Sequence, residues 1–244
     1  MTRLRIVAIL ALFVSTVAMS GQGRSGNGPP QGPPRGGPPS RALASDVPAD
    51  APFSPHKIAG NLYYVGTRGL AVYLLTTREG HILINGVYPA SVPLVRASVE
   101  ALGFRTTDIK LMLNSHAHPD HVSGNADLKA LTGASVLVMD DDVDVIKSGG
   151  RSDFQYANQE NFPPGPVDRV LHDGDHVGLG STTLTAMKTP GHTRGCTTWT
   201  FSVTDEGRNY DVVILCSINF NPGYRPRGVS RRIRPADAAL TGRT

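Results

Sequence analysis

The segment His116-Ala117-His118-Pro119-Asp120-His121 places three imidazole rings and one carboxylate within six residues. Zinc in proteins is bound by histidine nitrogens and aspartate oxygens, and a catalytic zinc site keeps one position open for water. Neither a regular helix nor a regular strand directs all four of these side chains toward one point. The segment therefore predicts a hydrolytic metal site on a turn between a strand and a helix, rather than a polar loop that only caps the helix.

The residues on either side of this segment predict that turn. Residues 110–113 (Lys-Leu-Met-Leu) are expected to form a short buried strand, and Asp120 to Leu131 a helix. Pro119 falls near the first helical turn, where a missing N–H costs nothing. Because His116 and His118 lie beside the adjacent pair Asp120 and His121, we expect room for two neighbouring metal ions.

A further candidate ligand lies in Thr189-Pro190-Gly191-His192-Thr193. A histidine in a Pro-Gly turn is by default a polar surface residue, because loops lie at the surface. Catalytic zinc, however, takes three protein ligands and a water. We therefore expect His192 to hold one zinc ion together with His116 and His118.

The body of the chain alternates strands and helices. We expect strands at residues 62–65, 71–75, 81–84, 135–139, 182–187, 197–203 and 210–215. Ser91 is expected to cap a helix whose Val95, Val99 and Leu102 face the core, and Gly103 to end it. Strands, helices and then strands again predict two sheets with helices outside.

The ends of the chain differ from its body. Residues 1–20 are expected to be a secretory signal peptide, because two arginines precede an apolar stretch (Ile6 to Val17) and small residues allow cleavage before Gly21. The stretch is shorter than the roughly 20 residues that span a bilayer, so export to the periplasm or medium is favoured over a membrane anchor. Residues 21–50 form a Gly- and Pro-rich leader that is expected to be disordered.

The positive charge of the chain belongs to its ends. The formal net charge is +4, of which two charges come from Arg3 and Arg5. Residues 221–244 hold six arginines and one aspartate, so the rest of the chain carries a net charge of −3. The charge therefore gives no argument for nucleic acid as a partner.

Cys196 and Cys216 are the only two cysteines of the chain. They can pair in an oxidising compartment. Each lies in an apolar, strand-like context, so two buried free thiols are at least as well supported by the sequence.

These motifs resemble the metallo-β-lactamase superfamily. Its His-x-His-x-Asp-His pattern matches residues 116–121, and its Pro-Gly-His turn matches His192. Three stretches look like its subclass-three enzymes: Gly-Asn-Leu-Tyr-Tyr-Val-Gly at 60–66, Ser-Gly-Gly-Arg-Ser-Asp-Phe at 148–154, and Gly-His-Thr-Arg-Gly-Cys-Thr-Thr-Trp at 191–199. The resemblance covers roughly Pro52 to Tyr224. It implies an α/β (α+β) fold, a four-layer αβ/βα sandwich with the zinc site at one edge between the sheets, and a domain over 51–224.

The resemblance also assigns roles to single residues. It implies a first zinc ion held by His116, His118 and His192, and a second held by Asp120 and His121. Asp120 would in addition be catalytic, because it would orient the nucleophile.

The same resemblance places Ser217 and Asn219 in the region where the family binds the carboxylate of the substrate. It leaves Cys216 as a buried residue at the end of a strand, because His121 makes a thiolate ligand unnecessary.

The implied function is zinc-dependent hydrolysis of the β-lactam ring of penicillins, cephalosporins and carbapenems by a metal-bound hydroxide, which would confer antibiotic resistance. A small molecule is then the partner, the mature protein needs no membrane, and a monomer is expected. Lactonases and glyoxalase-type thioesterases of the superfamily are an alternative. They end the last strand of this region with Gly-Asp, whereas this chain has Cys216-Ser217 there.

The chain departs from the family pattern after His192. No further histidine follows it, although the family has one more metal ligand late in the chain, and a final strand and helix. Residues 225–244 contain six arginines and only three large aliphatic residues. A nucleic-acid-binding arm would look similar, but a tail read out of frame explains the abrupt change better. We therefore expect the second half of the sandwich to be incomplete and the second zinc ion to bind weakly. An inactive truncated homologue is the second functional hypothesis.

Overall fold

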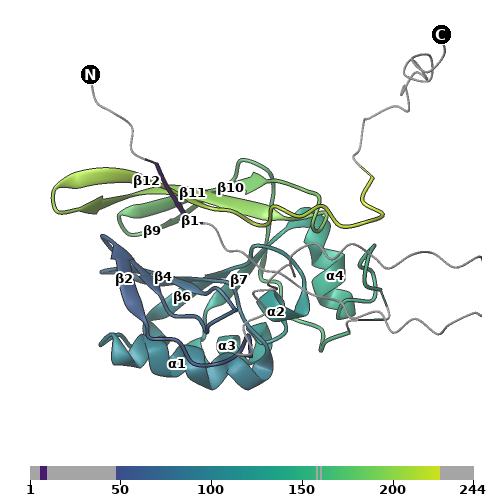
Figure 1. The fold of residues 1–244 in the computed structure, drawn as a ribbon, viewed down its shortest axis with the longest axis horizontal. Coiled ribbons are helices and arrows are strands. Elements are labelled where there is room, and N and C mark those ends of the chain that lie inside the picture. Colours follow the sequence, from purple (N-terminus) through teal and green to yellow (C-terminus); the bar gives the residue numbers. More distant parts are fainter. Residues whose placement is uncertain (1–5, 10–47, 158, 160, 226–244) are drawn as a thin grey trace, which may run out of the picture.

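The computed structural model describes residues 6–9, 48–157, 159 and 161–225. Most of the predicted signal peptide, the Gly- and Pro-rich leader up to residue 47 and the tail from residue 226 lie outside the described residues. Within them, two β-sheets pack face to face, and helices cover the outer side of one sheet (Figure 1).

The larger sheet has seven strands in sequence order: β2 (His56–Ala59), β3 (Leu62–Tyr64), β4 (Tyr73–Thr77), β5 (Gly80–Ile84), β6 (Ile109–Leu113), β7 (Ser135–Met139) and β8 (Arg169–Leu171). Strands β2 to β5 form an antiparallel meander, and the pairs from β5 to β8 are parallel. Parallel strands need long crossover connections. The helices α1 (Val92–Ala101), α2 (Pro119–Val122) and α3 (Asn125–Thr132) lie in these connections, and α4 (Val143–Ser148) follows β7. Short 3₁₀ turns lie at Pro89–Ser91, Thr106–Asp108 and Asp140–Asp142.

The smaller sheet has the order β1 (Ile6–Ile9), β12 (Arg208–Ile214), β11 (Thr197–Asp205), β10 (Thr182–Lys188) and β9 (His176–Leu179). Strands β9 to β12 are antiparallel neighbours. Strand β1 pairs in parallel with β12, with Ile6 opposite Asp211 and Ile9 opposite Ile214. This strand lies within the predicted signal peptide, so a chain that begins at Gly21 would have no β1 beside β12.

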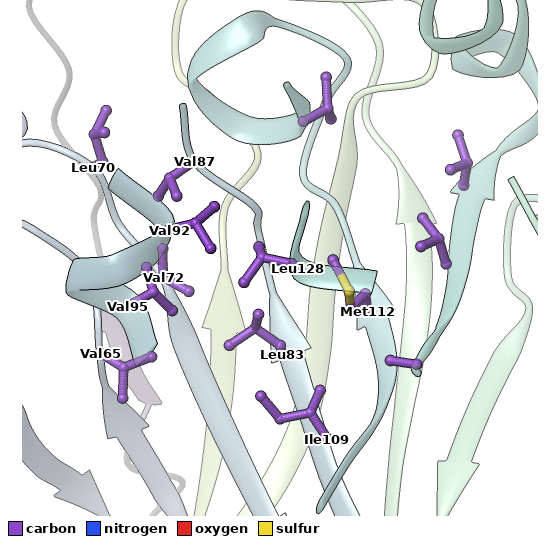
Figure 2. Packing of buried hydrophobic residues seen from close by; sticks show 14 of the residues in the cluster. Val65, Leu70, Val72, Leu83, Val87, Val92, Val95, Ile109, Met112 and Leu128 are labelled. Carbon is purple, nitrogen blue, oxygen red and sulfur yellow. The ribbon is translucent and has the colours of Figure 1, made fainter. Parts of the chain in front are cut away.

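Two apolar layers hold the domain together. The first lies between the helices and the seven-stranded sheet, where Val95 and Leu128 meet Leu83 and Met112 (Figure 2). The second lies between the two sheets and includes Trp199, the largest fully buried side chain. Burial of such apolar surface is the main favourable contribution to folding.

The smaller sheet is covered on one face only. Along β10 the side chains alternate, with Leu184 and Ala186 buried against the other sheet and Thr183 and Met187 exposed. Among the described residues, no helix lies over this outer face (Figure 1). The α/β fold class is thus confirmed, with helices over the outer face of one of the two sheets among the described residues. The predicted incompleteness of the second half stays a prediction.

Helix α1 begins and ends almost as predicted. Val95 and Val99 are fully buried, Leu102 packs against the same cluster, and Gly103 follows with a positive φ of 83°. Ser91 is the N-cap residue of α1, as predicted, but its side chain makes no capping hydrogen bond. A 3₁₀ turn directly precedes α1, so the chain at Ser91 is already helical, with φ −93° and ψ −9°.

The helix predicted over residues 120–131 is in fact two helices, α2 and α3. The break lies at Gly124, whose N–H donates to the carbonyl of Val87 over 2.7 Å. A Cβ at this position would also meet the Val87 oxygen at 2.7 Å, so only glycine allows this approach. The hydrophobic periodicity that predicted one long helix is a local pattern. It therefore carries no information on this contact with the segment after β5. Strands β1, β2, β8 and β9 and helix α4 were not predicted.

Leu184 and Thr183 test the one-sided burial of the smaller sheet. Replacing Leu184 with Ala leaves a cavity between the sheets and should lower the free energy of unfolding by about 2–5 kcal/mol. Thr183→Ala, on the outer face of the same strand, should change it by less than about 0.5 kcal/mol. Chemical denaturation of both variants measures this, and equal losses would contradict the described packing.

Candidate metal centre

The histidine-rich segment lies at the end of β6, between this strand and α2. Three hydrogen bonds fix the residues that lead into this segment. Asn85, with a positive φ of 72°, accepts the N–H of Ser115 over 2.8 Å and donates to the carbonyl of Ala71. Trp199 donates its ring N–H to the carbonyl of Asn114 over 3.2 Å. The loop after β6, which carries His116 and His118 and is called a metal loop below together with the His192 loop, is thereby attached to both sheets.

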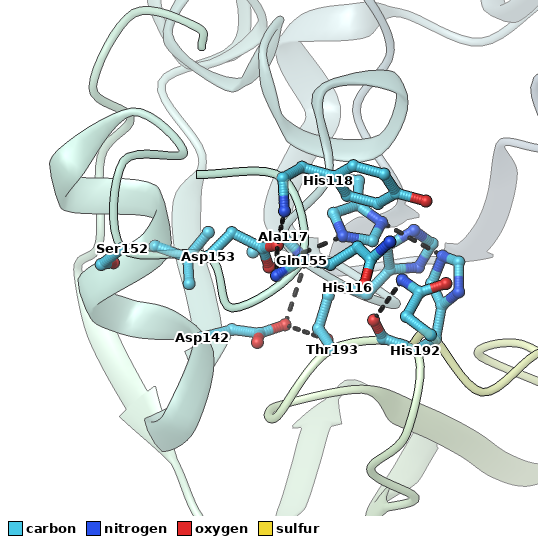
Figure 3. Close-up of polar contacts among 12 residues, drawn as sticks. His116, Ala117, His118, Asp142, Ser152, Asp153, Gln155, His192 and Thr193 are labelled. Atoms are coloured by element: carbon cyan, nitrogen blue, oxygen red, sulfur yellow. Dashed lines mark hydrogen bonds and ion pairs between the residues drawn. The ribbon is translucent and has the colours of Figure 1, made fainter. Parts of the chain in front are cut away.

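The second loop brings His192 to the same place. It connects β10 to β11, and it is held to the histidine-rich segment at its base by the Thr197 N–H, which donates to the Ser115 carbonyl over 2.7 Å. Figure 3 shows His116, His118 and His192 converging from the two loops. The predicted association of these three residues is therefore confirmed as an arrangement in space.

The nitrogen atoms of these histidines are spaced like ligands of one ion. Nδ1 of His118 lies 3.1 Å from Nε2 of His192, and one ligand atom from each of the three histidines lies within 4.8 Å of the others. Two nitrogens that each lie about 2.0–2.1 Å from a tetrahedral zinc ion are about 3.3–3.4 Å apart. The arrangement thus fits zinc.

A second set of possible ligands consists of His116, Asp120 and His121, whose ligand atoms also lie within 4.8 Å of one another. The structure therefore brings the predicted pair Asp120 and His121 to the site, next to His116. Because His116 belongs to both sets, five residues cannot supply three separate ligands to each of two ions. The expected weakness of the second position stays a prediction.

The electrostatics favour the protonation states that metal ligands need. Burial and then the neighbouring imidazoles lower the pKa of His116 well below 6.5 and that of His192 to about 4. Burial alone would raise the pKa of Asp120, but the charge and hydrogen bond of His121 outweigh it and lower this pKa to about 2. Neutral imidazoles and an ionised carboxylate bind metal without first releasing a proton.

Two acidic residues that sequence reasoning missed support the site. Asp153 is buried, and its Oδ2 lies 3.7 Å from Nε2 of His118. Asp142 is also buried and accepts hydrogen bonds from both metal loops. Burial dominates its environment and raises the pKa of Asp142 to about 6. The only sequence signal for Asp142 is the run Asp140-Asp141-Asp142 directly after a predicted strand.

The segment after β12 lies against the His192 loop. Asn221, also missed in the sequence, donates its side-chain amide to the His192 carbonyl over 2.7 Å. Its own N–H donates to the Gly191 carbonyl. The predicted substrate residues Ser217 and Asn219 belong to this segment, and the Asn219 N–H donates to Ser217 Oγ over 3.1 Å. Their contact with a substrate carboxylate stays a prediction.

Cys196 and Cys216 form a disulfide, so the alternative of two free thiols is wrong. The bridge connects the start of β11 to the segment after β12. Cys216 is buried, as predicted, and its Sγ lies 3.8 Å from Nδ1 of His116. The disulfide therefore fixes the segment after β12 directly beside the metal centre.

The fold and the site are those of a two-sheet α/β protein with a candidate metal centre at the ends of two strands. The chain belongs to the metallo-β-lactamase superfamily, because the model of this family matches residues 65–204. This family typically binds zinc, and the cluster of His116, His118 and His192 is the corresponding candidate metal site.

Solved structures similar to this chain include metallo-β-lactamases of class B3. FEZ-1 from Legionella gormanii is 55% identical, with a TM-score of 0.70, and the match covers 73% of this chain and 69% of FEZ-1. The class B3 di-zinc enzyme LRA-12 from an Alaskan soil metagenome is 40% identical, with a TM-score of 0.67, covering 70% of this chain and 65% of LRA-12. BJP-1 from Bradyrhizobium japonicum, of subclass B3, is 41% identical, with a TM-score of 0.64, covering 69% and 64%.

Curated relatives point to a different hydrolase. A hydroxyacylglutathione hydrolase from Rhodospirillum rubrum is 33% identical over 107 residues, which are 44% of this chain and 34% of the relative. Another, from Methylococcus capsulatus, is 35% identical over 124 residues, which are 51% of this chain and 40% of the relative. The chain thus spans about a third to two fifths of the length of these relatives.

The low pKa of His192 predicts how the stability of the metal-free protein depends on pH. Between pH 6.5 and about 4, the unfolded state binds a proton at this residue and the folded state does not, so the free energy of unfolding falls as the pH falls. The His192→Gln variant lacks this proton. As the pH falls across this window, the unfolding free energy of the variant should therefore rise relative to that of the unaltered protein, by at most about 1.4 kcal/mol per pH unit.

Urea denaturation of both metal-free proteins at several pH values measures this difference. A difference that stays constant between pH 6.5 and 4 would contradict the buried, neutral state of His192.

Proposed function

We propose that this protein hydrolyses the β-lactam ring of antibiotics with zinc bound at His116, His118 and His192. The observation that supports this most strongly is the convergence of these three buried or half-buried histidines, with Asp120 and His121 beside them, in a chain 55% identical to a metallo-β-lactamase over most of the described domain.

The chemistry of the bound metal suits hydrolysis. Zinc lowers the pKa of a coordinated water and polarises a carbonyl group. The chain supplies what this chemistry needs. His116 and His192 stay neutral because their pKa values are lowered, and so they remain ligands at neutral pH. Asp120 stays ionised, with a pKa of about 2, and can accept a hydrogen bond from the attacking water and orient it.

Asp120 and His121 would also hold a second cation beside the first. Because His116 is shared between the two sets of ligands, this cation would bind more weakly. A positive charge there would stabilise negative charge that develops on the leaving nitrogen of an opened lactam.

Hydrolysis of a thioester such as hydroxyacylglutathione is the second candidate, favoured by the curated relatives. The sequence of the segment after β12 is evidence against thioester hydrolysis. This segment contains Cys216-Ser217 where the thioesterases have their Gly-Asp, so no carboxylate stands there, and Cys216 forms the disulfide with Cys196. The β-lactam proposal is also supported by the higher identity and coverage of the class B3 structures.

We further propose that the protein acts as a monomer in the periplasm or outside the cell, where its activity would confer resistance. The disulfide supports this location, since disulfides persist in oxidising compartments. No helix in the described residues is long and apolar enough to cross a membrane.

Replacement of His118 by Ala tests the proposed function. The variant should lose hydrolysis of the chromogenic cephalosporin nitrocefin by more than about 100-fold, because it removes a ligand and not only a supporting group. His172→Ala is the matched control, since the His172 side chain is 70% exposed, and it should leave the rate unchanged. Absorbance of opened nitrocefin measures both. Undiminished turnover by His118→Ala would refute the assigned ligand.

A further inference from the structure

Asp142 stands between the two loops that carry the metal ligands. It ends the 3₁₀ turn after β7, and its residue is only 2% exposed. It belongs to neither set of possible metal ligands in the described residues. A buried carboxylate is costly unless hydrogen bonds compensate for lost water, so its contacts must account for its presence.

All three donors to Asp142 come from the metal loops. Oδ2 accepts the N–H of Ala117 over 3.0 Å and the hydroxyl of Thr193 over 2.8 Å (Figure 3). Oδ1 accepts the N–H of Gly195 over 2.8 Å. Ala117 lies between His116 and His118, and Thr193 directly follows His192. One carboxylate thus connects the chain positions next to all three ligands of the first set.

The loops are built to meet this carboxylate closely. A Cβ at position 195 would lie 2.6 Å from Cγ and 2.7 Å from the backbone nitrogen of Asp142, so glycine is required there. Thr193 is completely buried. At their bases the loops are joined by the backbone bond between Thr197 and Ser115 and by the ring N–H of Trp199, which donates to the Asn114 carbonyl. Asp142, in contrast, acts beside the histidines themselves.

We infer that Asp142 is a positioning residue, which sets the separation of His192 from His116 and His118 by joining their loops through one carboxylate. The inference rests on the proposed metal centre. It predicts that the charge-assisted bonds to backbone N–H groups, which are roughly twice as strong as neutral ones, hold the ligands in the geometry that zinc requires.

An asparagine cannot replace this carboxylate. Its amide offers one accepting oxygen and one donating NH₂ group. In one orientation the NH₂ group faces the N–H of Gly195, and in the other it faces the N–H of Ala117. Asp142→Asn therefore breaks the connection to one loop while keeping the shape of the side chain.

The test compares zinc affinity among the unaltered protein, Asp142→Asn, Thr193→Val and Asp168→Asn. Asp168 is the matched control, because it too accepts a backbone N–H, that of Val136 over 2.7 Å, but at the opposite end of β7. Competition with a chromophoric chelator measures the affinity of the tighter site. Asp142→Asn should weaken it about 10- to 100-fold, in the range of supporting residues at metal sites. Thr193→Val, which removes one hydroxyl donor, should weaken it less.

Two further measurements separate positioning from folding. The visible spectrum of the Co²⁺-substituted protein should change in Asp142→Asn and stay unchanged in Asp168→Asn, although both substitutions lower the melting temperature of the metal-free protein.

Should Asp142→Asn fail to fold, Thr193→Val carries the test alone. Unaltered zinc affinity and Co²⁺ spectrum in the folded Asp142→Asn, or in Thr193→Val when it stands alone, would overturn the inference. So would an equal loss of affinity in Asp168→Asn. Failure of the unaltered protein to bind zinc would instead refute the metal centre itself.

Discussion

The centre of this protein depends on one electrostatic constraint: several imidazole rings share a buried space in which they cannot all be protonated. The ring of His116 lies 4.8 Å from that of His118, 4.0 Å from His121 and 4.4 Å from His192, measured between centroids. Such a cluster gains little as a structural element, because burial and mutual repulsion both disfavour its charged forms. A divalent cation turns the same arrangement into a favourable one, since it binds the neutral rings and the ionised Asp120.

The rest of the fold brings these groups together from distant parts of the sequence. The parallel strand β6 ends at the edge between the two sheets and delivers the histidine-rich segment, and the loop between β10 and β11 delivers His192 from the other sheet. The disulfide between Cys196 and Cys216 and the amide of Asn221 then hold the segment after β12 against that loop. The site is thus supported from both sheets.

The sequence predicted that His116, Asp120 and His121 lie together, because these residues are local. Residues 116–121 lie within one turn, and zinc chemistry demands those residue types, so the motif was sufficient without knowledge of the fold. His192 needed the additional requirement of a third ligand. By contrast, Asp142, Asp153 and Asn221 act through contacts with residues 25 to 53 positions away, and no local pattern marks them.

The same distinction explains the errors in the fold. Strand β7 was predicted with both of its ends correct, because it is a buried apolar run between turn residues. The helix over residues 120–131 was predicted as one, since its periodicity is local, but the break at Gly124 is imposed by the carbonyl of Val87 from another element. The pairing of the cysteines likewise depends on how β11 and β12 lie side by side, which sequence spacing does not determine.

The most direct test of the account is to count bound zinc and to measure turnover on one sample of folded protein. A carbapenem, a cephalosporin and a hydroxyacylglutathione thioester would be assayed in parallel. The account predicts about one tightly bound zinc ion per chain, hydrolysis of both β-lactams and little or no cleavage of the thioester, with activity lost when a chelator removes the metal. Folded protein that binds zinc but cleaves only the thioester, or that leaves all three substrates intact, would contradict it.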